Sequence, residues 1–92
     1  MVTAVVLIKA QTDRVPELAE ELAELEGVSE VFSVAGQYDL VALVRVRENE
    51  DLATVISGRM RKLPGITCSE TLISFKVYSK QDIDAGFALG LD

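Results

Sequence analysis

A short pattern that occurs twice limits the folds open to this 92-residue chain more than any other feature. Leu-Glu-Gly-Val at residues 25–28 returns as Leu-Pro-Gly-Ile at residues 63–66. Each copy follows a segment whose apolar residues have helical spacing, and each precedes a segment typical of a strand. Glycine is the residue that most often ends a helix. The repeat therefore predicts two equivalent joins from helix to strand.

The segments around these joins complete a strand, helix, strand order in each half of the chain. In the first half we predict a strand at residues 2–10 and a helix capped by Thr12 or Asp13, with Pro16 in its first turn. Two hairpin strands follow at residues 28–35 and 38–47. We then predict a helix that is capped by Asn49 and includes Gly58, and a last strand from Ile66 to about Tyr78. This order predicts an α+β, ferredoxin-like βαββαβ domain with a four-stranded antiparallel sheet over residues 1–79. For the tail, residues 80–92, we predict a short helix or turn that packs on a neighbour.

The strands at residues 2–10 and 38–47 are apolar on both alternating faces, as expected for the two central strands of this fold. Two helices can cover only one face of the sheet. The other face would expose Val and Leu side chains, and a large apolar patch on a globular protein usually marks an interface. The sequence therefore predicts a homodimer whose sheets pack face to face, a dimeric α+β barrel.

Charge and composition exclude several classes of function. The net charge of −6 argues against direct nucleic-acid binding, and Arg59, Arg61 and Lys62 are expected to complement the dipole of the second helix. No apolar run approaches the ~20 residues of a membrane helix. The first residues lack the basic segment of a secretory signal, so we expect a cytoplasmic protein without a membrane partner.

The chain contains one cysteine and no histidine. Cys68 therefore has no partner for an internal disulfide, and we expect it to be buried as a small apolar residue. The commonest general base, zinc ligand and haem ligand are all absent. We predict neither a metal nor another cofactor, no catalytic residue, and a function other than catalysis.

The densest polar cluster is the predicted turn of the hairpin, Gly36-Gln37-Tyr38-Asp39. Asp39 could accept hydrogen bonds from an ammonium group, Tyr38 could contact an apolar side chain, and free amides near Gly36 could bind a carboxylate. A zwitterionic amino acid needs this set of groups. In the alternative interpretation, Gly36 and Asp39 only form the turn and Tyr38 packs at its edge.

Ser69 and Thr71 are two positions apart on the last strand, so they lie on one face. Their hydroxyl groups suit the polar end of a small ligand. The preference of threonine for strands is an alternative reason for part of this pattern.

These three motifs in this order resemble the effector-binding domain of the Lrp/AsnC family of feast/famine transcriptional regulators: Gly36 to Asp39 between strands, Leu63 to Ile66 before the last strand, and Ser69 to Ile73 within it. The resemblance covers roughly residues 1–79. It implies a homodimer that assembles into an octamer or similar ring. It also implies an amino-acid effector at subunit contacts, bound by Gly36, Gln37, Tyr38, Asp39 and Leu40 with Ser69 and Thr71.

Regulators of this family begin with a helix-turn-helix domain, whereas this chain opens on a predicted strand. We therefore expect a stand-alone domain that senses a small molecule, with co-assembly with full-length Lrp/AsnC regulators as one route of action. Two alternatives remain open. One is an enzyme resembling the dimeric α+β barrel monooxygenases, against which the missing histidine and the few polar residues in the sheet count. The other is a domain that serves assembly only.

Overall fold

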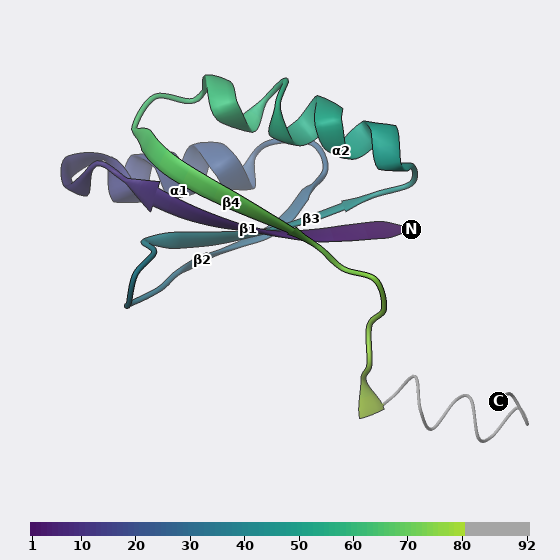
Figure 1. Ribbon diagram of the computed structural model, residues 1–92. Coiled ribbons are helices and arrows are strands. Elements are labelled where there is room, and N and C mark those ends of the chain that lie inside the picture. The colour runs from purple at the N-terminus through teal and green to yellow at the C-terminus, as the bar shows by residue number, and fades with distance from the viewer. Residues whose placement is uncertain (81–92) are drawn as a thin grey trace, which may run out of the picture.

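The computed structural model describes residues 1–80 and has the predicted βαββαβ order (Figure 1). The elements are β1 (Val2–Ala10), η1 (Thr12–Arg14), α1 (Val15–Ala23), β2 (Val28–Ser33), β3 (Leu40–Val46), α2 (Asn49–Ile56), η2 (Met60–Lys62) and β4 (Ile66–Ile73). The four strands form one antiparallel sheet in the order β2-β3-β1-β4. The prediction that the first and third strands are central is therefore confirmed.

The helix starts differ from the predicted ones. A single 3₁₀ turn, η1, precedes α1, and no side-chain cap forms at Gln11 or Arg14, although Pro16 does lie in the first turn of α1. The N-cap of α2 is Glu48 and not Asn49. Its amide donates to the carboxylate of Asp51 at 3.1 Å, while the Glu48 side chain accepts from the third helical amide.

The second helix also ends earlier than predicted. α2 stops at Ile56, before Gly58, and the chain continues into the 3₁₀ turn η2, which contains Arg61 and Lys62. Glycine is a poor helix former, which favours an end at this point. In the described residues 1–80, no helix has the length and apolar character that a membrane crossing requires.

The two glycine joins are equivalent in three dimensions. Gly27 and Gly65 have φ angles of +96° and +102°, which glycine adopts far more readily than other residues. The carbonyl of Gly27 accepts the amide of Arg45 at 2.9 Å, and that of Gly65 accepts the amide of Gln11 at 2.8 Å. Gly27 is thus bonded to β3, the neighbour of β2, and Gly65 to the residue that follows β1, the neighbour of β4, so the internal repeat is confirmed.

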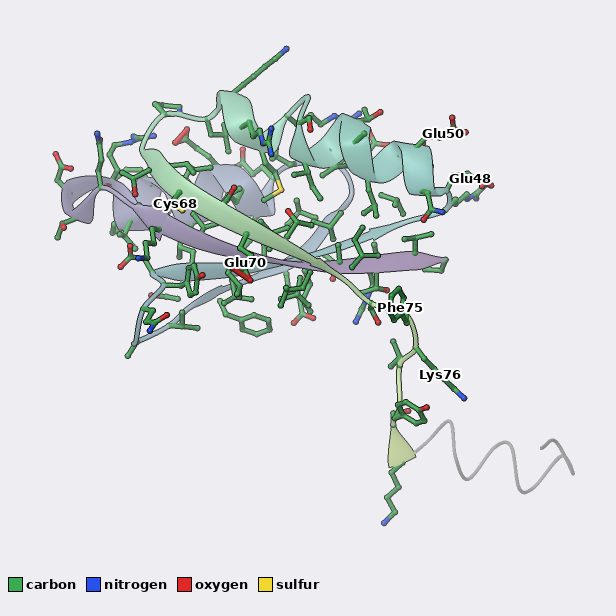
Figure 2. All side chains as sticks on the ribbon, in the orientation of Figure 1. Glu48, Glu50, Cys68, Glu70, Phe75 and Lys76 are labelled. Carbon is green, nitrogen blue, oxygen red and sulfur yellow. The ribbon has the colours of Figure 1, made fainter. Side chains whose placement is uncertain are left out.

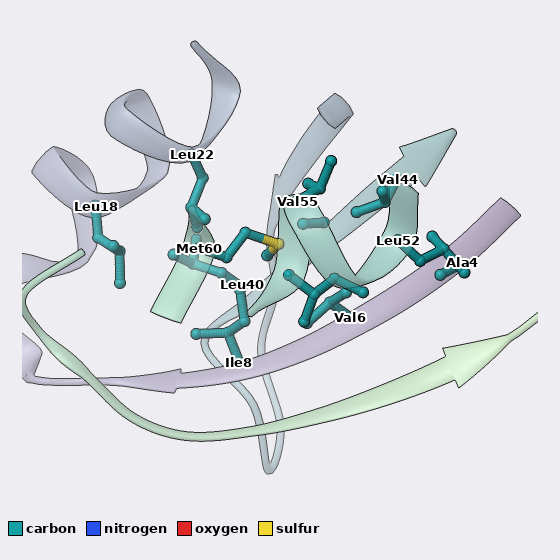
Figure 3. Close-up of a cluster of buried hydrophobic side chains, with 12 residues drawn as sticks. Ala4, Val6, Ile8, Leu18, Leu22, Leu40, Val44, Leu52, Val55 and Met60 are labelled. Carbon is teal, nitrogen blue, oxygen red and sulfur yellow. The ribbon is translucent and has the colours of Figure 1, made fainter. Parts of the chain in front are cut away.

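Both helices lie on one face of the sheet, and the buried core fills the space between them (Figures 1 and 3). The core comprises Ala4, Val6, Ile8, Leu18, Leu22, Leu40, Ala42, Val44, Leu52, Val55, Ile56 and Met60. Alternate residues of β1 and β3 supply the sheet side of this core. Complete burial of each large aliphatic side chain contributes about 1.5–3 kcal/mol.

The opposite face of the sheet, which we call the open face, carries no helix. Residues paired across antiparallel strands point to the same side, so Val5 and its partner Leu43 both lie on the open face, beside Leu72 of β4. Cys68 also lies there, opposite Lys9, and is exposed. The expectation that Cys68 is buried is wrong for the single chain, because the outermost strand has no helix over this side.

Three strands are shorter than predicted. The hairpin strands cover residues 28–33 and 40–46, and β4 stops at Ile73 instead of continuing to Tyr78. The amide of Ser74 makes a last bond to the carbonyl of Thr3 at 2.9 Å, one residue from Val2, where β1 begins. The predicted tail element at residues 80–92 lies, apart from Lys80, outside the described residues.

Candidate functional site

The connection between β2 and β3, residues 34–39, is held to the sheet at its base. The amide of Val34 donates to the carbonyl of Asp39 at 3.0 Å, and the amide of Asp39 donates to the carbonyl of Ile8 at 2.9 Å. These bonds close the hairpin and attach it to β1. The base of the connection is therefore fixed while its tip is free to contact other molecules.

The side chain of Asp39 adds a third attachment. Its Oδ2 atom accepts the amide of Ala10 at 2.8 Å, where the pairing of β1 with β4 shifts register between Lys9 and Ala10. The amide of Ala10 points to the β3 side, where the pairing of β1 with β3 ends at Ile8 and Leu40, so the carboxylate supplies an acceptor that no strand residue provides. Within residues 1–80 the other oxygen of Asp39 has no hydrogen-bond partner.

The tip of the connection is exposed and its backbone donors are free. Gly36 has a φ angle of +128°, and a side-chain carbon built on it would meet no atom within 4 Å. Among the described residues, none accepts a hydrogen bond from the amides of residues 35, 36, 37 or 38. Consecutive free amides of this kind can bind an anionic group such as a carboxylate.

Tyr38 faces the open side of the sheet, where it meets one residue of β1 and one of β4. Its hydroxyl donates to Oε1 of Glu70 at 3.3 Å, and the ammonium of Lys9 lies 5.8 Å from the centre of its ring. Figure 2 shows Glu70 on the underside of β4, away from the helices. Partial desolvation, together with the nearby charge and hydrogen bond of Glu70, raises the pKa of Tyr38 above 10.0.

Ser69 and Thr71 occupy the other face of β4. They pair with Ile8 and Val6, whose side chains are buried beneath the helices. Because β4 is an edge strand, both hydroxyl residues are still exposed. In one copy of the chain, the Tyr38 phenol and these two hydroxyl groups therefore lie on opposite sides of the same strand.

Two predicted residues have different environments from the rest. Leu40 is fully buried in the core, where it supports the connection from below (Figure 3). Gln37 is exposed at the tip. The predicted residues thus gather at one corner of the sheet, but the single copy brings them together on two faces and not in one pocket.

Glu70 and Lys9 are neighbours of this corner that the sequence did not single out. Glu70 interrupts the mostly apolar alternation of Cys68 and Leu72, and such a charge on an otherwise apolar face is a detectable signal. Lys9 is likewise a charged residue that follows the apolar run of β1. Their contact with Tyr38 depends on strand register, which residue types alone do not give.

A groove of about 340 Å³ lies elsewhere, between the end of β3 and α2, and its lining includes Arg45, Arg47 and Arg59. The predicted site precedes β3, whereas this groove follows it, so the two lie at opposite ends of that strand. Arg59 is engaged at the groove by donating to the carbonyl of Glu26 at 2.8 Å. None of the predicted site residues lines it.

Comparison with known proteins identifies relatives across most of the chain. The family model for the Lrp/AsnC ligand binding domain matches residues 3–83. An uncharacterized HTH-type transcriptional regulator of Pyrococcus horikoshii, PH1916, is 34% identical over 84 residues, which cover 88% of this chain and 55% of the relative. A Pyrococcus abyssi HTH-type regulator, FL11, is 29% identical over 77 residues. The chain therefore spans about half the length of these curated relatives.

Solved structures give the same result. TTHA0845 from Thermus thermophilus is 46% identical and superposes with a TM-score of 0.82. The match covers 87% of this chain and all of TTHA0845. The feast or famine regulatory protein from M. tuberculosis, solved with L-methionine, is 28% identical with a TM-score of 0.69; the match covers 88% of this chain and 55% of that one.

Proposed function

Because the chain belongs to the Lrp/AsnC ligand-binding domain family, we propose that it is a non-enzymatic module that binds an amino acid at contacts between its copies. The main support for this proposal is that one connection presents both backbone amides, which bind an anion, and a carboxylate, which binds a cation. Free amides at residues 35–38 stand next to an Asp39 carboxylate that has one oxygen to spare. An amino acid presents a carboxylate and an ammonium group on one carbon, and these two sets of groups complement it.

The remaining groups suit the rest of such a ligand. Tyr38 offers an aromatic surface, held by its bond to Glu70, against which an apolar side chain can pack. Ser69 and Thr71 supply hydroxyl donors and acceptors on the other face of β4. One copy cannot present both faces to one small ligand. We therefore propose that a second copy completes the site, with Ser69 and Thr71 facing the Gly36–Asp39 connection of a neighbour.

Two relationships support this proposal. The M. tuberculosis regulator, similar to this chain at 28% identity, was solved with L-methionine. The open face carries half-buried Val5 and Leu43, apolar side chains that a second copy would cover. We propose a dimer through this face, and assembly of dimers into a larger ring. Co-assembly with full-length regulators is our proposed route to transcriptional control.

The first experiment is thermal unfolding with each of the twenty amino acids at millimolar concentration, followed by calorimetry on those that stabilise the protein. A ligand present at about 100 times its dissociation constant adds about 2.7 kcal/mol of stability. A selective rise for one class of amino acid supports the sensor. No rise with any of them, from a folded oligomer, contradicts it and favours the assembly-only alternative.

The decisive variant is Asp39→Asn, because it keeps an oxygen for the Ala10 amide and removes only the negative charge. Loss of the charge should weaken binding of an ammonium group about tenfold or more, since charge-assisted hydrogen bonds contribute roughly 1.5–3 kcal/mol. The matched control is Glu50→Gln, which removes one exposed carboxylate in the first turn of α2. Equal affinity of the two variants would remove Asp39 from the site.

A further inference from the structure

The groove between the end of β3 and α2 is lined by arginines that lack an anionic partner. α2 begins shortly after β3 ends and runs back over the sheet (Figure 1). The lining includes three of the nine basic residues of the chain, Arg45, Arg47 and Arg59, although the chain has a net charge of −6. Positive charge is therefore concentrated at one groove of an acidic protein.

Two carboxylate residues, Glu26 and Asp51, line the same groove, but neither forms an ion pair with an arginine there. The carboxylate of Asp51 accepts the amide of Glu48 at the N-terminus of α2 instead. Within residues 1–80, the side chain of Arg47 makes neither a hydrogen bond nor an ion pair. Guanidinium donors are thus left without acceptors at the groove.

Arg47 and Arg59 are the two arginines available to a ligand in the groove. Arg45 shares its side of β3 with Leu43, so it belongs to the open face. Arg47 directly follows β3, and Arg59 is half-buried beyond the end of α2. Arg59 uses one nitrogen, Nη1, to donate to the carbonyl of Glu26 at 2.8 Å. A guanidinium has five N–H donors, so most donors of both residues remain for a ligand.

The internal repeat shows which partner Arg59 lacks. At the second join, Arg14 donates through Nη2 to the carbonyl of Pro64, the residue before the glycine, at 3.3 Å. Arg59 makes the same kind of bond to Glu26, the residue before the other glycine. Arg14 also forms an ion pair with Glu21 of α1, whereas Arg59 has no carboxylate partner among residues 1–80. One half of the chain thus supplies an anion to its arginine, and the other half leaves that place open at a groove.

The rest of the lining suits a ligand that is part anion and part apolar. Val46 and Val55 provide an apolar wall, and Thr54 adds a hydroxyl group from α2. The volume of about 340 Å³ lies at the lower end of the range for small-molecule sites, about 300–1,000 Å³. Guanidinium groups from two separate segments suit a phosphate, because it offers more oxygens and more negative charge than a carboxylate.

We propose that this groove is a second ligand site, which binds a small molecule with a phosphate group through Arg47 and Arg59. The phosphate takes the place at Arg59 that a carboxylate of the chain itself has at Arg14. The apolar wall then contacts the rest of an organic phosphate such as a nucleotide. The groove and the Gly36–Asp39 connection lie at opposite ends of β3, so this inference does not depend on the proposed amino-acid site.

The test is isothermal titration calorimetry of the 92-residue protein with inorganic phosphate, AMP and adenosine, in a buffer free of phosphate. We expect AMP to bind and adenosine not to bind. Tighter binding of AMP than of inorganic phosphate would identify an organic phosphate as the ligand, and equal affinities would identify free phosphate. Adenosine binding as tight as that of AMP, or no binding of either phosphate compound at millimolar concentration, would overturn the proposal.

The variant that places the site is Arg47→Gln, because this arginine makes no side-chain bond within the described residues. It should raise the dissociation constant of the phosphate compound about tenfold or more, as expected when a charge-assisted hydrogen bond is lost. Arg61→Gln in η2 removes the same charge outside the groove and should leave the constant unchanged. Equal effects of the two changes would show that the anion responds to overall charge and not to the groove.

A second variant supplies the carboxylate that the groove lacks. Thr54→Glu introduces one on α2, where it can pair with Arg59 as Glu21 pairs with Arg14. It should abolish binding of the phosphate compound, while thermal unfolding confirms that the variant is folded. The matched control is Ala53→Glu, which adds the same charge at an exposed neighbour outside the groove and should still bind. Undiminished binding by Thr54→Glu would remove the anion from Arg59.

Discussion

The carboxylate of Asp39 accepts the amide of Ala10 at 2.8 Å, across a sequence separation of 29 residues. Asp39→Ala removes this acceptor beyond the last pair of β1 with β3, where no strand residue replaces it. We expect a loss of about 1–2 kcal/mol in the free energy of unfolding, measured by urea denaturation. Asp39→Asn should lose less, because an amide oxygen can still accept the bond. Equal stabilities of Asp39→Ala and the wild type would show that water substitutes for the carboxylate.

Replacing Gly27 tests the join between α1 and β2. A side-chain carbon at Gly27 would lie 2.6 Å from Cγ2 of Val55, and φ is +96°. Gly27→Ala should cost about 1–3 kcal/mol from overpacking in addition to about 1 kcal/mol of backbone strain. Gly36→Ala is the control for backbone strain without overpacking, because no atom lies within 4 Å of a side-chain carbon built on Gly36. A second change, Val55→Ala, should relieve part of the overpacking, so the two losses should not add.

A charge on the open face should separate the proposed dimer. Leu43→Glu or Val5→Glu would bury an unpaired carboxylate between the two sheets. The free-energy cost of that burial exceeds what a single residue typically contributes to the stability of a dimer. Light scattering should then report the mass of a single chain. Ala53→Glu on the exposed side of α2 introduces the same side chain away from the open face, and its mass should stay that of the wild-type oligomer. An unchanged mass for both open-face variants would exclude this interface.

The hydroxyl of Tyr38 should ionise above its ordinary pKa of 10.0. Desolvation and the negative charge of Glu70 both disfavour the phenolate, so Glu70→Gln should lower the pKa toward the ordinary value. Because the folded protein holds the proton more tightly than the unfolded chain, Tyr38 should reduce stability as pH rises above about 10. Ultraviolet absorbance in a Tyr78→Phe background follows Tyr38 alone. The same titration midpoint with and without Glu70 would exclude the interaction.

Local sequence patterns predicted the fold because each element carries its own signal. The two-sided apolar strands, the apolar stripes of the helices and the two glycine joins are readable over a few residues, and they are enough for the strand order. Features that depend on distant partners were missed. The early end of β4 lies near the start of β1, its neighbour in the sheet, and the exposure of Cys68 follows from the position of β4 at the edge.

The candidate site follows the same rule. Residue types at the Gly36–Asp39 connection suggested its groups, and the structure places these groups at an exposed corner. The Ala10 amide is left to Asp39 because the pairing of β1 with β3 ends at Ile8 and Leu40, and residue types alone do not reveal this register. The separation of Ser69 and Thr71 from Tyr38 across β4 depends on pairing with β1, which residue spacing on one strand does not reveal.

The pairing of β1 with β4 also governs how this protein is made. β1 precedes the other strands of this sheet in the chain, yet one of its two neighbours, β4, ends only at Ile73. A nascent chain can form the first helix and the hairpin, but one side of β1 stays unpaired until β4 has been made. Contacts between the ends of a chain form slowly, and an unpaired apolar strand is prone to aggregation. In this domain, the sheet is therefore complete only after β4 has been made, and until then β1 has one unpaired edge.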